Sequence, residues 1–235
     1  FAEKAGVAEF FIDFSNSIAG HTMGGPAKVA IFSSALIGSV TGSTVANVYT
    51  TGQFTIPMMK RLGYKPSIAG AIEALASNGG QMMPPIMGAA AFILAAYSGV
   101  PYIEVAIASL IPALLYFGGL FWFIHLEAHK TGLVGIPVEE KPSIMKVLLK
   151  GGHLVSPLLA LIGCLIYGFS PVRAAFYAIF FTVVVSWLRK ETRIGPKEFI
   201  EALELGAGDV KQGKVLATLA GEQLTEADLD RMVER

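Results

Sequence analysis

Two short polar runs interrupt the long hydrophobic stretches of the first hundred residues. The runs are Gly38-Ser-Val-Thr-Gly-Ser-Thr-Val-Ala-Asn47 and Ser77-Asn-Gly-Gly-Gln-Met-Met-Pro-Pro85, and both contain residues that break helices. Apolar sequence flanks them at 29–37, 69–76 and 86–96. Backbone without helical hydrogen bonds is tolerated at membrane depth only where protein buries it or where it lines a cavity. The pattern therefore predicts two helices that are broken inside a membrane, an arrangement typical of transporter binding sites.

The first interrupted segment allows two shapes. Residues 27–59 are almost uncharged, and as one continuous helix they would be about 50 Å long, which exceeds an ordinary membrane span. They could form a kinked span or a re-entrant hairpin whose tip reaches mid-membrane and returns. Lys28 precedes the segment and Lys60, Arg61 and Lys65 follow it. Because basic residues prefer the cytoplasmic side and only the hairpin places all of them there, we expect a re-entrant hairpin over 27–65.

The rest of the hydropathy pattern predicts an all-α membrane protein. Pro84-Pro85 should end the first half of the second interrupted helix, and Pro85 should begin its second half. Because the chain starts at Phe1 and not at Met, we expect it to be cut from a longer protein. The expected parts are an amphipathic helix or the end of a preceding helix at 1–26, the re-entrant hairpin at 27–65, a broken transmembrane helix at 66–98, a transmembrane helix with a kink at Pro112 at 99–130, a cytoplasmic connector at 131–152, two transmembrane helices at 153–190, and an amphipathic helix with a polar tail at 191–235.

Composition supports a membrane location. The chain has 235 residues, of which 53% are hydrophobic and 15% charged, and its formal net charge is +0. Soluble domains carry about 25% charged residues, so the lipid bilayer is the expected surrounding. A chain without a basic excess cannot neutralise phosphates, which excludes nucleic acid as a partner on bulk electrostatics. The one cysteine, Cys164, cannot form a disulfide within the chain.

A helix that stops halfway through a membrane exposes two kinds of end. The last turn of the leading half presents unpaired carbonyl oxygens, which suit a small hard cation such as Na⁺. The first turn of the following half presents unpaired amides, which suit a carboxylate. One broken pair can thus hold a cation and an anion without any charged side chain. The candidates are Ser39, Thr41, Gly42, Ser77, Asn78 and Gly79 for Na⁺, and Ser43, Thr44, Asn47, Pro85 and Gly88 for an organic anion.

Other interpretations of these residues stay open. Gly38 and Gly42 have the spacing that lets helices approach closely, so the glycine runs could serve packing alone. Glu73 is either an intramembrane functional carboxylate or an interfacial residue. His125 and His129 are four residues apart, which is also a metal-ligand spacing, although they lie at an expected membrane edge. The spans contain no nucleophile–base pair and no metal cluster, and the chain has no phosphate-binding loop, so neither an enzyme nor an ATP-driven pump is supported.

Several stretches also resemble a known family. They are Gly38-Ser-Val-Thr-Gly-Ser-Thr-Val-Ala-Asn-Val, Thr51-Gly-Gln-Phe-Thr-Ile-Pro-Met-Met-Lys-Arg-Leu-Gly-Tyr64, Gly70-Ala-Ile-Glu-Ala and Gly79-Gly-Gln-Met-Met-Pro-Pro-Ile-Met-Gly-Ala-Ala-Ala-Phe92. These stretches resemble the large membrane subunit of tripartite ATP-independent periplasmic (TRAP) transporters. The resemblance is greatest to the fused permease that works with TAXI-type solute-binding proteins.

The resemblance implies an elevator-type secondary transporter of the bacterial inner membrane. It implies a Na⁺ gradient as the driving force, organic acids as substrates, and a periplasmic solute-binding protein with a small membrane subunit, or its fused equivalent, as partners. The chain would be the first of two inverted repeats, and the missing second repeat should follow near residue 206, where a polar tail stands instead. Ala96 occupies a position where family members commonly carry an acidic residue. The alternative function is a membrane assembly or scaffold subunit whose glycines only pack helices.

Overall fold

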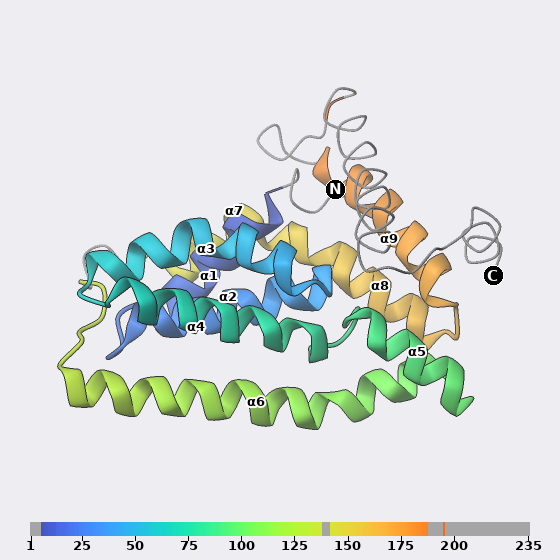
Figure 1. Cartoon of the computed structure of the whole chain (residues 1–235). Coiled ribbons are helices and arrows are strands. Elements are labelled where there is room, and N and C mark those ends of the chain that lie inside the picture. Colours follow the sequence, from blue (N-terminus) through green and yellow to red (C-terminus); the bar gives the residue numbers. More distant parts are fainter. Residues whose placement is uncertain (1–5, 138–141, 188–194, 196–235) are drawn as a thin grey trace, which may run out of the picture.

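The computed structural model describes residues 6–137, 142–187 and 195, and helices are the regular secondary structure of these ranges (Figure 1). This agrees with the expected all-α class. The helices are α1 (Val7–Ala19), α2 (Gly25–Thr41), α3 (Thr44–Arg61), α4 (Pro66–Gly79), α5 (Ala89–Ser98), α6 (Tyr102–Thr131), α7 (Ile144–Gly151), α8 (Ser156–Ile166) and α9 (Pro171–Ser186), with 3₁₀ turns η1 (Gly80–Met82) and η3 (Gly152–Val155).

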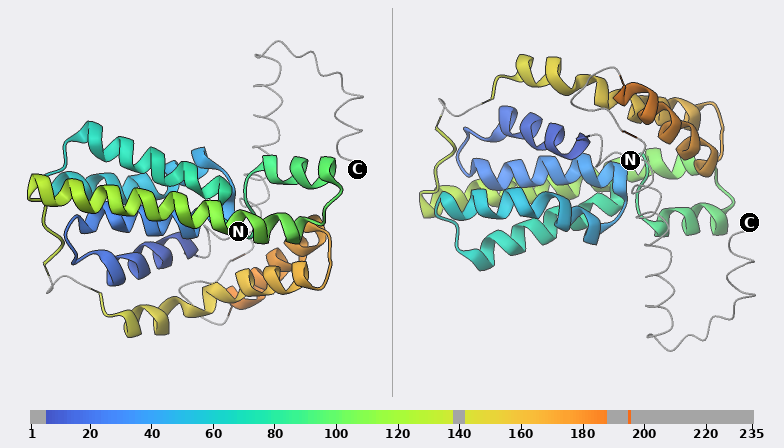
Figure 2. Two further views of the ribbon diagram at one scale, coloured as in Figure 1. Left: turned by 90° about the horizontal axis from the view of Figure 1, so that it is seen from below. Right: turned by 90° about the horizontal axis from the view of Figure 1, so that it is seen from above.

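Helix α2 is the centre of a bundle formed by α1 to α4. It packs against α1 on one side and against α3, α4 and α6 on others (Figures 1 and 2). Its buried face carries small residues, among them Ala27, Ala30 and Ala35, which let the neighbouring helices approach closely. The remaining buried members of this core are Ile31, Met59, Tyr64, Ala69, Ile72, Ala76, Phe117 and Ile124.

Helix α6 has 30 residues and runs along the whole bundle (Figures 1 and 2). It continues through Pro112 as one helix. From its middle onward it packs on α4, and there Tyr116 donates a 2.8 Å hydrogen bond to the carbonyl of Leu75. Its first half meets α5, α8 and α9 at one end of the molecule, where Tyr102 stacks on Phe92 with ring centroids 4.7 Å apart.

The outer faces of these helices are apolar. Among the described residues, Tyr102–Thr131 and Ile144–Ile166 are long and apolar enough to cross a membrane, and α5 and α9 are shorter apolar helices. Large hydrophobic side chains on them face outward, including Leu115 at 72% exposure and Phe176 at 67%. Such surfaces suit contact with lipid.

The structure differs from the prediction in two places. The expected connector at 131–152 contains α7, which runs through η3 into α8, so the apolar stretch begins at Ile144. Hydropathy missed α7 because Lys146 and Lys150 make the segment polar on average, although they share one face of the helix and Val147 is buried in the core around α1. Pro85 does not begin a helix, and the next helix, α5, starts at Ala89. The predicted tail at 191–235 lies outside the described residues, Gly195 excepted.

Candidate functional site

The first polar run forms the tip of a helical hairpin. Helix α2 ends at Thr41, α3 begins at Thr44, and the two helices lie side by side (Figure 1). Gly42 has a φ of +62°, a left-handed conformation that favours glycine, and its amide donates to the Gly38 carbonyl at 2.8 Å. The Ser43 hydroxyl accepts a 3.4 Å hydrogen bond from the Ala46 amide and caps α3. A carbonyl-rich helix end and an amide-rich helix end therefore meet within two residues.

The second polar run is a longer break. Helix α4 ends at Gly79, and an irregular segment follows η1 before α5 begins. The Gly88 amide donates to the Gln81 carbonyl at 2.8 Å, which closes this segment into a loop. The Tyr102 hydroxyl lies within hydrogen-bond distance of the carbonyls of Pro85 and Ile86 and holds the loop against α6.

The two breaks fit into each other. The Ile86 amide donates to the Ser39 carbonyl at 3.2 Å, and the Gln81 side chain donates to the Thr44 hydroxyl at 2.6 Å. A Cβ atom on Gly38 would lie 2.4 Å from the Cα of Gly80, and these two glycines therefore pack backbone against backbone. The glycines of both runs thus make close packing possible, whatever else the breaks do.

Asn47 is buried at the contact between the breaks. Its side chain is 0% exposed, and its Nδ2 donates a 2.9 Å hydrogen bond to the Ser34 carbonyl. A carbonyl only accepts, so the amide nitrogen must face it and Oδ1 must point away. Oδ1 is buried without a hydrogen-bond partner. Because buried polar atoms are almost always satisfied, this oxygen can serve a ligand that donates or carries positive charge.

The structure brings only some of the predicted site residues together. Ser39, Gly42, Thr44 and Asn47 lie at the contact between the two breaks, and Ser43 is exposed at the hairpin tip, where it caps α3. Thr41 is exposed one residue before the hairpin tip.

Other predicted residues point elsewhere. Asn78 is exposed, and Gly79 faces α6, where a Cβ atom would lie 2.6 Å from the Tyr116 ring. The Ser77 hydroxyl donates to the Glu73 carboxylate and not to the break. Pro85 is buried and has no amide hydrogen, and the Gly88 amide is already bonded to Gln81. Neither of these two residues offers the free amide that the sequence interpretation assigned to it.

A second polar cluster surrounds Glu73, whose side chain is 0% exposed. Hydroxyl groups from Ser34 on α2, from Thr51 and Thr55 on α3, and from Ser77 on α4 contact its carboxylate. The sequence left Glu73 undecided between an interfacial and a functional residue, and the structure places it inside the bundle. The four-residue spacings of Thr51 to Thr55 and of Glu73 to Ser77 were the signal that could have found the cluster.

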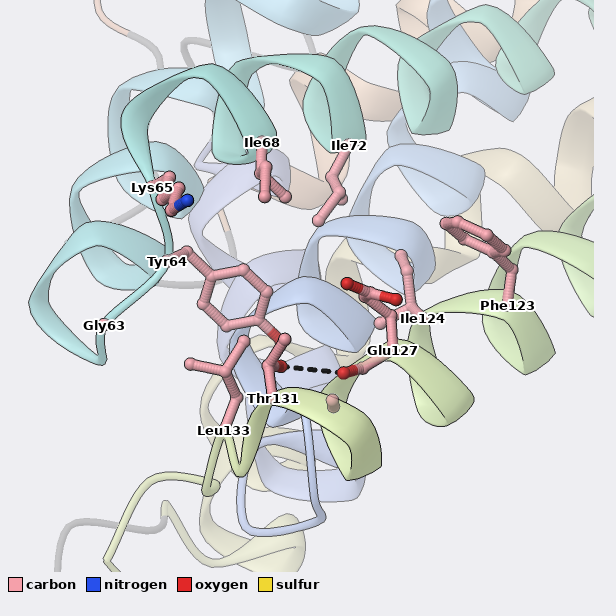
Figure 3. A pocket seen from close by; sticks show the side chains of 11 residues that line it. Gly63, Tyr64, Lys65, Ile68, Ile72, Phe123, Ile124, Glu127, Thr131 and Leu133 are labelled. Carbon is pink, nitrogen blue, oxygen red and sulfur yellow. Dashed lines mark hydrogen bonds between the residues drawn. The ribbon is translucent and has the colours of Figure 1, made fainter.

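A cavity of about 270 Å³ lies at the opposite end of the bundle, between the turn before α4 and the end of α6 (Figure 3). Its wall is mostly apolar and includes Lys65 and Glu127, and the Thr131 hydroxyl beside it donates to the Glu127 carbonyl at 2.7 Å. This cavity contains none of the residues that the sequence assigned to a site.

His125 and His129 do not form a metal site with other ligands in the described ranges, where no group of three or more histidine, cysteine, aspartate or glutamate residues is suitably placed. His125 Nδ1 instead lies 3.1 Å from the ammonium nitrogen of Lys28. Lys28 is 3% exposed and its ammonium group also sits 4.7 Å from the centre of the Phe121 ring. These contacts fasten the start of α2 to α6.

Comparison with known families identifies the family of the chain. A family model described as the DctM component of tripartite ATP-independent periplasmic transporters matches residues 1–229. The chain belongs to this family. The predicted TRAP permease resemblance is therefore confirmed, and a family of transporters agrees with the prediction that the chain is not an enzyme.

Curated relatives come from several bacteria. The chain is 28% identical over 212 residues to the C4-dicarboxylate TRAP transporter large permease protein DctM of Pseudomonas aeruginosa. The aligned region covers 87% of the chain and 48% of the relative. It is 27% identical over 181 residues to the sialic acid TRAP transporter permease protein SiaT of Haemophilus influenzae, with coverage of 77% and 29%. It is 27% identical over 187 residues to the sialic acid permease SiaM of Vibrio cholerae, with coverage of 77% and 43%. The chain thus spans less than half the length of these relatives.

Proposed function

We propose that this chain is the permease segment of a Na⁺-driven TRAP transporter and forms the first inverted repeat of an elevator-type carrier that takes up an organic acid. Na⁺ binds at the hairpin tip beside the end of α2, and the carboxylate of the substrate binds at the start of α3. The observation that carries the proposal is the unsatisfied Oδ1 of Asn47, a buried residue that lies beside the contact between the two breaks.

Na⁺ suits this place because its ligands are oxygens. Asn47 Oδ1 is an unused acceptor in a buried position, and the last turn of α2 directs its carbonyl oxygens toward the same end of the hairpin. The partial negative charge of a helix C-terminus adds to the attraction. Ser39 and Gly42 contribute to the proposed Na⁺ site through the shape that they give to this turn. Ser77 and Gly79 take no part in it, because their contacts lie on other faces of α4.

The organic acid suits the start of α3 for the complementary reason. Ser43 satisfies one of the four amides that begin the helix, and the others carry the partial positive charge of a helix N-terminus. Thr44 is held at this end by the Gln81 side chain, which fixes the second break beside it. Sialic acid and C4-dicarboxylates, named for the relatives, each carry a carboxylate that such a site can bind.

The partners follow from the sequence resemblance. We propose a TAXI-type periplasmic solute-binding protein, a small membrane subunit or its fused equivalent, and a second inverted repeat that completes the site. The proposed location is the bacterial inner membrane, with several spans. The outward-facing hydrophobic side chains of α6, α8 and α9 support contact with lipid.

Thermal unfolding of the detergent-purified protein tests the Na⁺ site. The unfolding temperature should rise in NaCl relative to KCl at equal ionic strength, because an ion that binds only the folded state stabilises it. Asn47→Ala should reduce this difference. Ser67→Ala, at the exposed far end of α4, should leave it unchanged.

The same measurement separates the proposal from its alternative. A scaffold subunit that uses Gly38 and Gly80 only for packing has no reason to distinguish Na⁺ from K⁺. Identical unfolding temperatures in the two salts, for the unsubstituted protein, would refute the transport site and favour the scaffold. Succinate and sialic acid, added in NaCl, then probe the carboxylate site.

A further inference from the structure

Glu73 places a carboxyl group, which is negatively charged when ionised, in the interior of three packed helices. Its carboxylate contacts the Ser77 hydroxyl at 3.2 Å and the Ser34 hydroxyl at 3.4 Å, and both Thr51 and Thr55 lie closer. All four hydroxyl-bearing residues are 0% exposed, as is Glu73 itself. The cluster therefore consists of oxygen atoms that water does not reach.

The groups that contact this carboxylate are neutral. Ser34 faces it from α2, Thr51 and Thr55 from α3, and Ser77 from its own helix. The buried cation of α2, Lys28, is engaged instead with His125 and Thr22. Burying a carboxylate without a countercharge costs several kcal/mol. A proton or a bound cation can remove this cost, and the side chains around Glu73 supply no positive charge of their own.

The hydroxyls of Thr51 and Thr55 each face two acceptors. Thr51 Oγ1 is 2.8 Å from the carbonyl of Asn47, and Thr55 Oγ1 is 3.0 Å from the carbonyl of Thr51. Each hydroxyl also lies within donating distance of the Glu73 carboxylate, yet it has a single hydrogen and cannot satisfy both acceptors. At each threonine one acceptor oxygen therefore lacks a hydrogen, and a positive ion among these oxygens would compensate for it.

We propose that Glu73, Ser34, Thr51, Thr55 and Ser77 form a second Na⁺ site, enclosed between α2, α3 and α4. One carboxylate balances one positive charge, which favours a monovalent ion over a divalent one. The neutral hydroxyls complete the oxygen shell that a hard cation takes. This inference rests on the proposed function because it assigns the same coupling ion, and it moves Ser77 from the break to the enclosed site.

The enclosed site connects directly to the break. The Asn47 side chain donates to the Ser34 carbonyl, and the Asn47 carbonyl accepts from Thr51. Asn47 therefore touches residues of the enclosed site, and its Nδ2 also lies beside Gly38 and Gly80, the glycines at which the two breaks pack. An ion at Glu73 would hold the hairpin and α4 together and so fix the position of the Asn47 side chain. This shared residue would couple the two sites.

Binding of radioactive Na⁺ to the detergent-purified protein tests the inference. Glu73→Gln keeps the size of the side chain and removes its charge, so Na⁺ bound per protein should fall by about half. Glu104→Gln, at the exposed start of α6, is the matched control and should bind as much Na⁺ as the unsubstituted protein. Thr55→Val should also lose Na⁺, whereas Thr55→Ser keeps the hydroxyl oxygen and should retain it, which separates loss of a ligand from loss of the fold.

The outcomes distinguish this inference from the proposed function. Unchanged Na⁺ binding in folded Glu73→Gln would overturn the inference. Loss of binding in Asn47→Ala alone would still support the site at the break. Loss in Glu73→Gln with none in Asn47→Ala would support the enclosed site and refute the other. No Na⁺ binding by the unsubstituted protein would refute both.

Discussion

The α2–α4 bundle and the outer helices of this protein distribute polarity in opposite ways. The bundle buries polar side chains, whereas the outer helices turn large hydrophobic ones outward. The fully buried polar residues of the bundle are Ser33, Ser34, Asn47, Thr51, Thr55, Glu73 and Ser77. The outward hydrophobic residues include Ile107, Ile111 and Leu115 on α6 and Phe176 and Phe180 on α9, each at least 60% exposed.

The difference shows that two kinds of force hold the two regions. In lipid, burial of apolar surface does not drive helices together, because the surrounding chains are equally apolar. The bundle is held instead by hydrogen bonds among hydroxyls and by close backbone contact, such as that of Gly38 with Gly80. The outer helices need only match the lipid. Substitutions should therefore have different effects in the two regions.

The largest effect is expected for a charge on the outer face of α6. Leu115→Arg should oppose membrane insertion by about 3 kcal/mol, because arginine at the centre of a span is disfavoured by about that amount relative to leucine. Leu115 is 72% exposed, so the substitution removes little protein contact. The measurement is the inserted fraction of α6 in a translocon assay with microsomal membranes.

Val134→Arg is the control for this experiment. Val134 is 61% exposed in the loop after α6, where an arginine meets water and not lipid. Equal insertion of the two variants would show that α6 does not face lipid, and the contrast between the two regions would then disappear.

The position of the first break was predictable because it depends on local chemistry. Gly42 adopts a φ of +62° and Ser43 caps the next helix, and both properties belong to the residues themselves. Lys28 before the segment and Lys60, Arg61 and Lys65 after it predicted a hairpin, and α2 and α3 lie side by side. The prediction of the second break was less accurate. Pro85 suits the first turn of a helix, but the loop closed by Gly88 and Gln81 delays α5 to Ala89.

The contacts between segments could not be predicted in the same way. Gly38 and Gly80 are neighbours only after α4 has packed against α2, and no local pattern states this pairing. The Glu73 cluster collects hydroxyls from helices up to 39 residues apart in sequence. Hydropathy treats serine and threonine as nearly neutral, so a helix face that carries them differs little from an apolar one.

Gly42→Ala should cause the next largest loss, and Gly99→Ala is its matched control. Both glycines have a left-handed φ, +62° and +69°, so both substitutions strain the backbone by about 1 kcal/mol. A Cβ atom on Gly42 would also lie 1.9 Å from the Met87 carbonyl oxygen, whereas nothing lies within 4 Å of one on Gly99. Gly42→Ala should therefore cost about 1 to 3 kcal/mol more. Thermal unfolding in detergent measures the difference, and equal losses would mean that the two breaks do not interlock.

A smaller loss is expected for Thr51→Val, compared with Thr182→Val on α9. Both hydroxyls donate to the carbonyl four residues earlier, at 2.8 Å and 2.7 Å, and valine replaces threonine with the same shape. Only Thr51 also contacts Glu73. Removing one partner from a buried polar group costs about 1 to 2 kcal/mol, so Thr51→Val should lower stability by that amount and Thr182→Val by much less. Chemical denaturation checks this order, and the reverse order would contradict a polar core.

Ser43→Ala and Ser170→Ala form the last pair and should change stability least. Each serine caps a helix through its hydroxyl, at 3.4 Å from the Ala46 amide and 3.5 Å from the Arg173 amide, and each is exposed. Loss of such a cap costs about 0.5 to 1 kcal/mol, and the two variants should unfold at similar temperatures. They should differ in their response to organic acids. Removing the Ser43 hydroxyl alters the helix end at which the carboxylate is proposed to bind, whereas Ser170 begins α9 in the apolar region. Stabilisation by succinate or sialic acid in NaCl should therefore weaken in Ser43→Ala alone, and an equal response in both variants would place the carboxylate elsewhere.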